Sequence, residues 1–225
     1  MSMPFYVAPE QVMKDRADYA RKGIARGRSL IASTYCDGVI LAAENPSRML
    51  RKISEIYDRI GFAGVGKYNE FDQMRIAGIR HADLKGYSYS REDVDARSLA
   101  NQYAQILGQI FTNEMKPMEV EILVAEVGHD PSGDQLFHIQ YDGTLVDEEG
   151  FTVLGGDAEP IRERLGAAFD PGHDLAEAIR AGIAALAGPD RTLGSNELEL
   201  AILDRNGPRR TFRRIEDGEL DELLA

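Results

Sequence analysis

The chain has 225 residues, 43% of them hydrophobic, and a formal net charge of −12. This length allows one large domain or two small ones, with enough apolar residues for a full core. The acidic balance argues against a general nucleic-acid binder, and no apolar run is long enough to span a bilayer. The single cysteine, Cys36, excludes an internal disulfide and favours a reducing, cytoplasmic setting. No Cys/His cluster has the spacing of a zinc site, so we expect neither a metal nor another cofactor.

The first third of the chain predicts a helix, a hairpin and two further strands. Pro9 suits the first turn of a helix that we expect to end at Ala25, because apolar residues recur at helical spacing and Gly27 follows. Two strand-like runs then flank the turn Cys36-Asp37-Gly38. The predicted strands of this part are 30–34, 39–43, 52–57 and 61–66.

The rest of the chain alternates pairs of helices with blocks of strands. Ser90 and Asp93 predict a cap for the second helix of the first pair. The predicted helices are 68–85, 91–113, 158–169 and 175–186, and the predicted strands are 120–127, 135–139, 144–146, 151–154, 198–203 and 211–212. The acidic segment from Glu216 to Glu222 is interpreted as a solvated face.

This order of elements predicts the fold class. Pairs of helices between blocks of mostly antiparallel strands do not fit a doubly wound parallel sheet. They favour an α+β fold with four layers, αββα, in which two sheets stack face to face and a helix pair covers each outer face. Composition does not shift along the chain and no linker interrupts it, so we expect one domain over residues 1–225.

The stretch from Tyr19 to Asn45 is the most informative part of the sequence. It joins a basic helix end to the hairpin, whose second strand reads Gly-Val-Ile-Leu-Ala-Ala-Glu. This hairpin resembles the opening hairpin of proteasome subunits, which have the N-terminal-nucleophile hydrolase fold. Further segments that resemble the family follow in the same order: 50–58, 64–71, 136–143 and 151–156.

The helix before the hairpin identifies the kind of subunit. Catalytic subunits begin, after processing, with a threonine at the first strand, whereas here Arg28-Ser29 stands there after the charged segment Pro9 to Ala25. The chain therefore resembles the α-type, non-catalytic subunit, most closely the actinobacterial kind. Residues 1–8 lack the Tyr-Asp-Arg gating element of archaeal and eukaryotic subunits and carry Phe5-Tyr6-Val7-Ala8-Pro9 instead.

We expect no catalytic residues. A threonine protease uses a free N-terminal amine as the base for its hydroxyl, together with a lysine and a carboxylate. By the resemblance, Glu44 takes the place of the carboxylate and Lys52 lies close to the place of the lysine. The nitrogens of Arg28 and Ser29 are amides, which cannot act as bases. The alternative is an autoprocessed N-terminal-nucleophile hydrolase that exposes Ser29 by cleavage after Arg28.

The resemblance implies an architectural function. Seven copies would form a ring, and two such rings would cap the proteolytic rings of a β-subunit. The helix 9–25 would contact ring neighbours, residues 28–225 would form the sandwich, and unfolded protein substrates would enter along the axis. The apolar segment at the axis would close the pore: Met1, Ser2, Met3, Pro4, Phe5, Tyr6, Val7 and Ala8. The alternative for the helix is ordinary amphipathic packing on its own core.

Three basic residues are the other predicted site residues. By the resemblance, Lys52 lines a pocket between adjacent subunits and pairs with the C-terminal carboxylate of an activator, usually a ring-shaped ATPase; the alternative is a solvated surface lysine. Arg26 and Arg28, repeated around an axis, could form a positive ring that favours acidic unfolded segments.

Two further patterns are interpreted without a ligand. The corner Gly155-Gly156-Asp157-Ala158 resembles an anion-binding turn, but tight packing of a strand against a helix is the preferred interpretation. Glu119, Glu121 and Glu126 are interpreted as one solvated edge of a strand rather than a metal cage. A free-standing binding protein remains a third hypothesis for the whole chain, and it requires a monomer in solution.

Overall fold

The structure is a computed structural model that describes residues 8–47 and 49–224. Two five-stranded antiparallel sheets form its centre: sheet 1 has the order β10-β9-β2-β1-β8 and sheet 2 the order β3-β4-β5-β6-β7. The strands are β1 (Leu30–Tyr35), β2 (Gly38–Glu44), β3 (Ile53–Tyr57), β4 (Ile60–Gly66), β5 (Val120–Glu126), β6 (Gln135–Ile139), β7 (Leu145–Glu148), β8 (Phe151–Leu154), β9 (Leu198–Asp204) and β10 (Phe212–Ile215). The α-helices are α1 (Pro9–Ile24), α2 (Tyr68–Ser88), α3 (Ala96–Asn113), α4 (Ala158–Ala168), α5 (Leu175–Ala187) and α6 (Asp217–Leu224).

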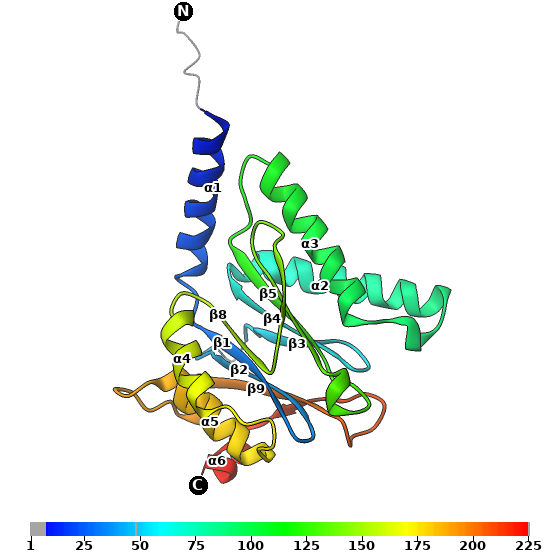
Figure 1. Cartoon of the computed structure of the whole chain (residues 1–225), viewed down its shortest axis with the longest axis vertical. Helices are drawn as coiled ribbons and strands as arrows, with labels where there is room; N and C mark the ends of the chain where they lie inside the picture. Colours follow the sequence, from blue (N-terminus) through cyan, green and yellow to red (C-terminus); the bar gives the residue numbers. More distant parts are fainter. Residues whose placement is uncertain (1–7, 48, 225) are drawn as a thin grey trace, which may run out of the picture.

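The layers follow the predicted αββα sandwich, which confirms the predicted fold class. Helices α2 and α3 cover the outer face of sheet 2, and α4 and α5 cover that of sheet 1 (Figure 1). Both faces of each sheet are therefore buried, and alternate residues of one strand serve different layers. In β2, Val39 and Leu41 lie in the core between the sheets, whereas Ile40 packs with the helices of sheet 1. Because residues on both faces of a strand are buried, the strands appear in the sequence as near-continuous apolar runs.

Helix α1 stands away from the sandwich (Figure 1). Only Ala20 and Ile24, in its last turns, are buried, and both join the core between the sheets. Val12, Met13 and Tyr19 are exposed. Most of α1 thus does not pack on the core of its own chain. Within residues 8–47 and 49–224, no helix is long and apolar enough to cross a membrane.

The start of α3 differs from the prediction. Arg91–Asp93 forms a short 3-10 helix, and the Ser90 hydroxyl accepts only from the amide of Glu92. The α-helix begins at Ala96, where the Asp95 carboxylate accepts from the Ser98 amide at 2.7 Å and the Glu126 carboxylate from the Ala96 amide at 2.7 Å. A carboxylate from β5 thus satisfies a free N–H group at the helix end, which a local sequence pattern does not reveal.

The C-terminal segment also differs from the prediction. The expected solvated acidic tail forms α6, which packs against α5 and buries Leu220. The strand before it, β10, extends to Ile215, because Arg213, Arg214 and Ile215 continue the pairing with β9. The acidic side chains remain on the outer side of a helix whose apolar residues complete the layer over sheet 1.

A charged cluster lies at the edge of the contact between the sheets. His138 on β6 is buried, with Nε2 3.5 Å from Glu121 Oε2 and Nδ1 3.8 Å from Glu148 Oε1. Glu148 also accepts from Arg162 on α4 at 2.9 Å and from the Thr152 hydroxyl on β8 at 3.0 Å. Burial alone would lower the pKa of His138, but the two carboxylates outweigh it and raise the pKa. Contact with His138 in turn lowers the pKa of Glu148.

This cluster makes stability depend on pH in a defined direction. Below the unfolded-state pKa of histidine, about 6.5, the stabilising contribution of His138 is fully present; it is lost as the pH rises through the raised folded-state pKa. We expect the free energy of unfolding of His138→Gln to change less than that of the parent between about pH 6 and about pH 8. Urea unfolding at a series of pH values measures this, with the exposed His129→Gln as the control. Parallel curves for parent and His138→Gln would contradict the assignment.

Candidate functional site at the start of the first strand

The predicted residues around Lys52 meet at one end of the β1–β2 hairpin. Leu30 pairs with Ala43, so Ser29 lies beside Glu44, whose amide donates to the Ser29 carbonyl oxygen at 3.1 Å. The ammonium of Lys52, at the entry to β3, donates to the carbonyl oxygen of Arg28 at 2.5 Å. The structure therefore brings Glu44 and Lys52 next to the consecutive residues Arg28 and Ser29.

Glu44 is the buried anion of this group. It is 6% exposed, and its carboxylate accepts from Arg28 and, at 3.1 and 3.2 Å, from the guanidinium of Arg191. Burial acts to raise the pKa of Glu44, but the hydrogen bonds from Arg191 and Arg28 outweigh it, and the pKa is lowered. Arg191 follows α5 and also donates to the carbonyl oxygens of Leu186 and Ala187 at the end of that helix. Sequence reasoning missed Arg191, because no local pattern marks its partner.

Lys52 is half-buried rather than freely solvated. Burial lowers its pKa to about 8, although the carboxylates of Glu199 and Glu44 act in the opposite direction. An ammonium has three donors, and the bond to the Arg28 carbonyl uses one of them. The other two remain for a carboxylate that reaches the same position. Lys52 is thus held in place while it keeps the capacity to bind an anion.

The corner at Gly155 and Gly156 is filled by packing. Gly155 has φ +117°, and a Cβ atom there would lie 2.9 Å from the Cα of Ser29; a Cβ on Gly156 would lie 2.8 Å from the Ala25 carbonyl oxygen. The glycines therefore let the β8–α4 turn approach the chain between α1 and β1. This geometry agrees with the preferred interpretation of tight packing.

The remaining predicted residues have separate surroundings. Arg26 is exposed, whereas Arg28 is paired with Glu44, which reduces the charge that Arg28 brings to a positive ring. Of the predicted gating segment, Met1 to Val7 lie outside the described residues, and Ala8 is an exposed residue before α1. Of the three basic residues predicted as site residues, Lys52 is therefore the one whose ammonium has a fixed position and can still bind an anion.

The three glutamates of the β5 region do not form one solvated edge, which corrects the prediction. Glu119 is buried and pairs with Lys116 at 2.8 Å. Glu121 contacts His138, and Glu126 caps α3. Each therefore has its own partner. Among residues 8–47 and 49–224, no group of three or more His, Cys, Asp or Glu side chains is arranged to hold a metal ion.

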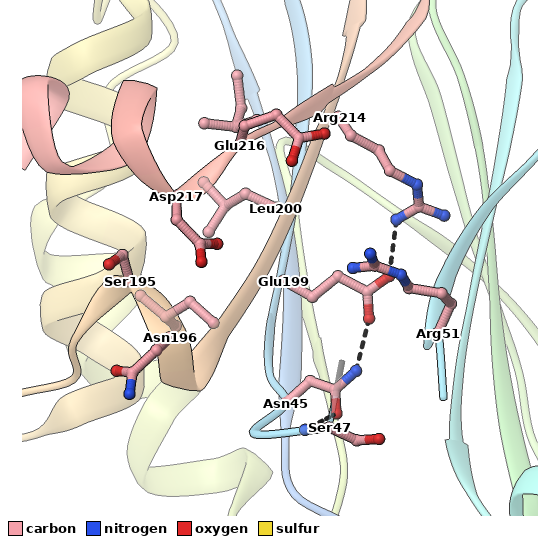
Figure 2. A pocket seen from close by; sticks show the side chains of 12 residues that line it. Asn45, Ser47, Arg51, Ser195, Asn196, Glu199, Leu200, Arg214, Glu216 and Asp217 are labelled. Atoms are coloured by element: carbon pink, nitrogen blue, oxygen red, sulfur yellow. Dashed lines mark hydrogen bonds and ion pairs between the residues drawn. The ribbon is translucent and has the colours of Figure 1, made fainter. Parts of the chain in front are cut away.

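A pocket is lined in part by the segment that leads to Lys52. Its lining includes Asn45, Arg51, Glu199, Arg214 and Glu216 (Figure 2). Glu199 lies on the pocket wall between Asn45 and Arg214, and hydrogen bonds of 2.7 Å join it to each of them. Sequence analysis did not single out Glu199, because a single polar residue within an apolar strand gives no indication of a site.

Comparison with known proteins identifies the class. The family model of proteasome subunits matches residues 24–203, which include the hairpin and both sheets up to β9, and the chain belongs to this family. The chain is 62% identical to a proteasome subunit alpha of Acidimicrobium ferrooxidans over 100% of its own length and 97% of the relative. It is 58% identical to the proteasome subunit alpha of Sanguibacter keddieii, with 100% and 90% covered, and 54% identical to that of Streptomyces scabiei, with 100% and 93% covered. It is an α-type proteasome subunit, as the hairpin and the preceding helix had indicated.

The environment of Lys52 generates a direct prediction. We expect the amine of Lys52 to titrate near pH 8, whereas the reference pKa of an exposed lysine is about 10.4. Reductive methylation with isotope-labelled formaldehyde, followed by NMR over a pH series, measures each lysine separately, and a Lys52→Arg variant assigns the signal. Lys116 is the internal control, because hydrogen bonds to Glu119 and Glu70 outweigh its partial burial and raise its pKa. A Lys52 signal that titrates with the exposed lysines would show that the ammonium is solvated.

Proposed function

We propose that this chain is a non-catalytic subunit of the proteasome core particle. Seven copies form each outer ring, the two outer rings template and cap the proteolytic rings of a β-subunit, and the N-terminal segment gates the entry of unfolded protein. A ring-shaped ATPase docks on the outer ring through its C-terminal carboxylate. The protein thus contributes assembly and access to intracellular protein degradation, and the partner subunit contributes the chemistry.

The observation that carries this proposal is the chemical state of the site. By the resemblance, Glu44 takes the place of the carboxylate of a threonine protease, and Lys52 lies close to the place of its lysine. The chain, however, continues from Ser29 through Arg28 into α1. The nitrogen of Ser29 is an amide without a basic lone pair, so nothing here replaces the free amine of a threonine protease. Lys52 donates to a backbone carbonyl rather than to a nucleophilic hydroxyl. A carboxylate and a lysine without a base and nucleophile support binding, not hydrolysis.

The surface of α1 supports the ring contact. Val12, Met13 and Tyr19 are exposed on a helix that stands away from the body (Figure 1). Tyr19 and Val12 line one shallow pocket together with exposed Met115 and buried Pro117. Apolar side chains grouped on a projecting helix favour contact with another protein surface. We infer that a neighbouring copy in the ring covers them.

The alternative, a hydrolase that exposes Ser29 by self-cleavage, is opposed by the packing of α1. Cleavage after Arg28 would remove Ala20 and Ile24 from the core between the sheets. Loss of the buried Ile24 side chain alone would cost about 2 kcal/mol. It would also remove the Arg28 carbonyl that Lys52 binds and the guanidinium that pairs with Glu44. Cleavage would therefore leave the core between the sheets without two of its residues and Glu44 without one of its guanidinium partners.

Co-expression with a β-type subunit from the same source tests the proposal. We expect a multi-ring particle that cleaves a fluorogenic peptide only when the partner is present, in which this chain keeps its full mass. Deletion of residues 2–8 should raise peptide hydrolysis severalfold without changing the native mass, because the apolar segment no longer closes the pore. A monomer or dimer that cleaves alone, with a new N-terminus at Ser29, would overturn the proposal. Unchanged hydrolysis after the deletion would overturn the gate.

Docking through Lys52 makes a second prediction. Lys52→Ala in the assembled particle should weaken binding of a peptide with the C-terminal sequence of the ATPase by about tenfold or more, because a charge-assisted hydrogen bond is lost. Binding to the parent should also fall as the pH rises through about 8, where Lys52 loses its proton. Fluorescence anisotropy measures both effects, and the same peptide with an amidated C-terminus is the control. Equal binding by parent and Lys52→Ala would exclude this role.

A further inference from the structure

Glu199 is a buried carboxylate that the proposed function does not use. It lies on β9, is 4% exposed and forms part of the wall of the pocket in Figure 2. Its neighbours on the strand, Leu198 and Leu200, pack with the helices that cover sheet 1, so Glu199 points toward the other side of the sheet. A carboxylate in such a place is costly unless its lone pairs are all engaged.

Four donors from three parts of the chain converge on this carboxylate. Oε2 accepts from Asn45 Nδ2 at 2.7 Å and from the amide of Lys52 at 2.8 Å. Oε1 accepts from the amide of Ile53 at 3.3 Å and from Arg214 Nη1 at 2.7 Å. The Asn45 and Arg214 contacts are drawn in Figure 2. Glu199 on sheet 1 thus binds the backbone at the first residue of sheet 2.

Two partners of Glu199, Asn45 and Arg214, form further hydrogen bonds to the segment between β2 and β3. Asn45 Nδ2 also donates to the Leu50 carbonyl oxygen at 2.7 Å, and Asn45 Oδ1 accepts from the Ser47 amide at 3.1 Å. Arg214 Nη2 donates to the Ile53 carbonyl oxygen at 2.5 Å, so both backbone groups of Ile53 are bound. The amide of Lys52 is therefore bound by Glu199, while its carbonyl oxygen accepts from the Gly64 amide of β4 at 3.1 Å.

Residues 49–51 of this segment bury little apolar surface, although Ile53 at its end lies in the core between the sheets. Met49 is 89% exposed and Leu50 is 47% exposed, and Arg51 is exposed as well. A segment with few buried apolar contacts depends on its hydrogen bonds for a fixed conformation. The hydrogen bonds to Glu199 are charge-assisted and shielded from water. They are therefore the strongest of the hydrogen bonds that this segment makes.

We propose that Glu199 is the positioning residue for Lys52: its carboxylate fixes the segment 45–53 to sheet 1 and so holds the Lys52 ammonium where a C-terminal carboxylate can dock. Glu199 does not touch the docking partner; it acts through the backbone of Lys52 and Ile53. The positioning stands on the hydrogen bonds of this chain, and its consequence for docking rests on the function proposed above.

Glu199→Gln is the sharp test, because it keeps the shape of the side chain. The amide has one acceptor oxygen and one NH2 group, whereas each carboxylate oxygen now accepts from two donors. Either orientation of the glutamine sets its NH2 group against two donors. Glu216→Gln is the matched control, because Glu216 is an exposed residue that lines the same pocket and the substitution changes the charge equally.

Two readouts on the full chain measure positioning without any partner. Hydrogen exchange at the amides of Lys52 and Ile53 should become about tenfold faster or more in Glu199→Gln, with exchange in the centre of β9 unchanged. The titration of methylated Lys52 should shift to lower pH, because Glu199 raises the pKa of Lys52 in the parent. Glu216→Gln should leave both unchanged. A merely structural destabilisation would speed exchange throughout the sheet and would not move the titration selectively.

The docking readout uses the assembled particle and the labelled C-terminal peptide of the ATPase. We expect Glu199→Gln to weaken binding about tenfold, with assembly intact and Glu216→Gln binding as the parent does. Unchanged exchange and titration in Glu199→Gln would overturn the positioning role. If exchange and titration change but neither Glu199→Gln nor Lys52→Ala alters peptide binding, the positioning role stands and the docking role of Lys52 fails. If Lys52→Ala weakens binding and Glu199→Gln does not, positioning for docking is overturned.

Discussion

The burial of both faces of both sheets is the constraint on which the rest of this structure depends. The inner faces form one core, and the outer faces are covered by helix pairs, so any charged side chain that enters the sandwich needs a partner inside it. For two of these charges the partner comes from the side of the opposite sheet: Glu199 on β9 binds the start of β3, and Arg205, after β9, forms a bidentate pair with Asp134 before β6. These polar contacts at opposite ends of β9 set the register of one sheet on the other.

The same constraint gives the site its character. Glu44 ends a fully buried strand, and its charge is balanced by Arg28 and Arg191 instead of by water. Lys52 lies against the Arg28 carbonyl, where burial lowers its pKa toward neutrality. In a chain that began at this strand, the same position would present an amine and a nucleophile. Here a peptide bond joins Ser29 to the preceding residue, so its nitrogen is an amide and not a basic amine.

Much of the fold could be predicted, because both sheets and the four covering helices leave periodic apolar patterns. The hairpin, β6 and β8 are nearly as predicted, and the Gly-rich β4 accommodates the Phe71 ring over Gly64. The predicted start of α3 was wrong because Asp95, helped by Glu126 from β5, caps the helix in place of Ser90. The sequence analysis did not predict that the acidic C-terminal segment forms a packed helix, in which Leu220 is buried against the layer over sheet 1 while Asp221 and Glu222 remain exposed.

The sequence by itself determined the layered α+β class and the family, because each depends on residue order and short-range periodicity. It also placed Glu44 and Lys52 near one another through the family's pattern. Only the tertiary structure decided that Lys52 is half-buried on the Arg28 carbonyl, that Arg191 neutralises Glu44, and that Glu199 holds the segment before β3. The Arg28 contact joins residues 24 positions apart and the other two join residues 147 positions apart. A hydrogen bond depends on distance and direction in space, which no local pattern encodes.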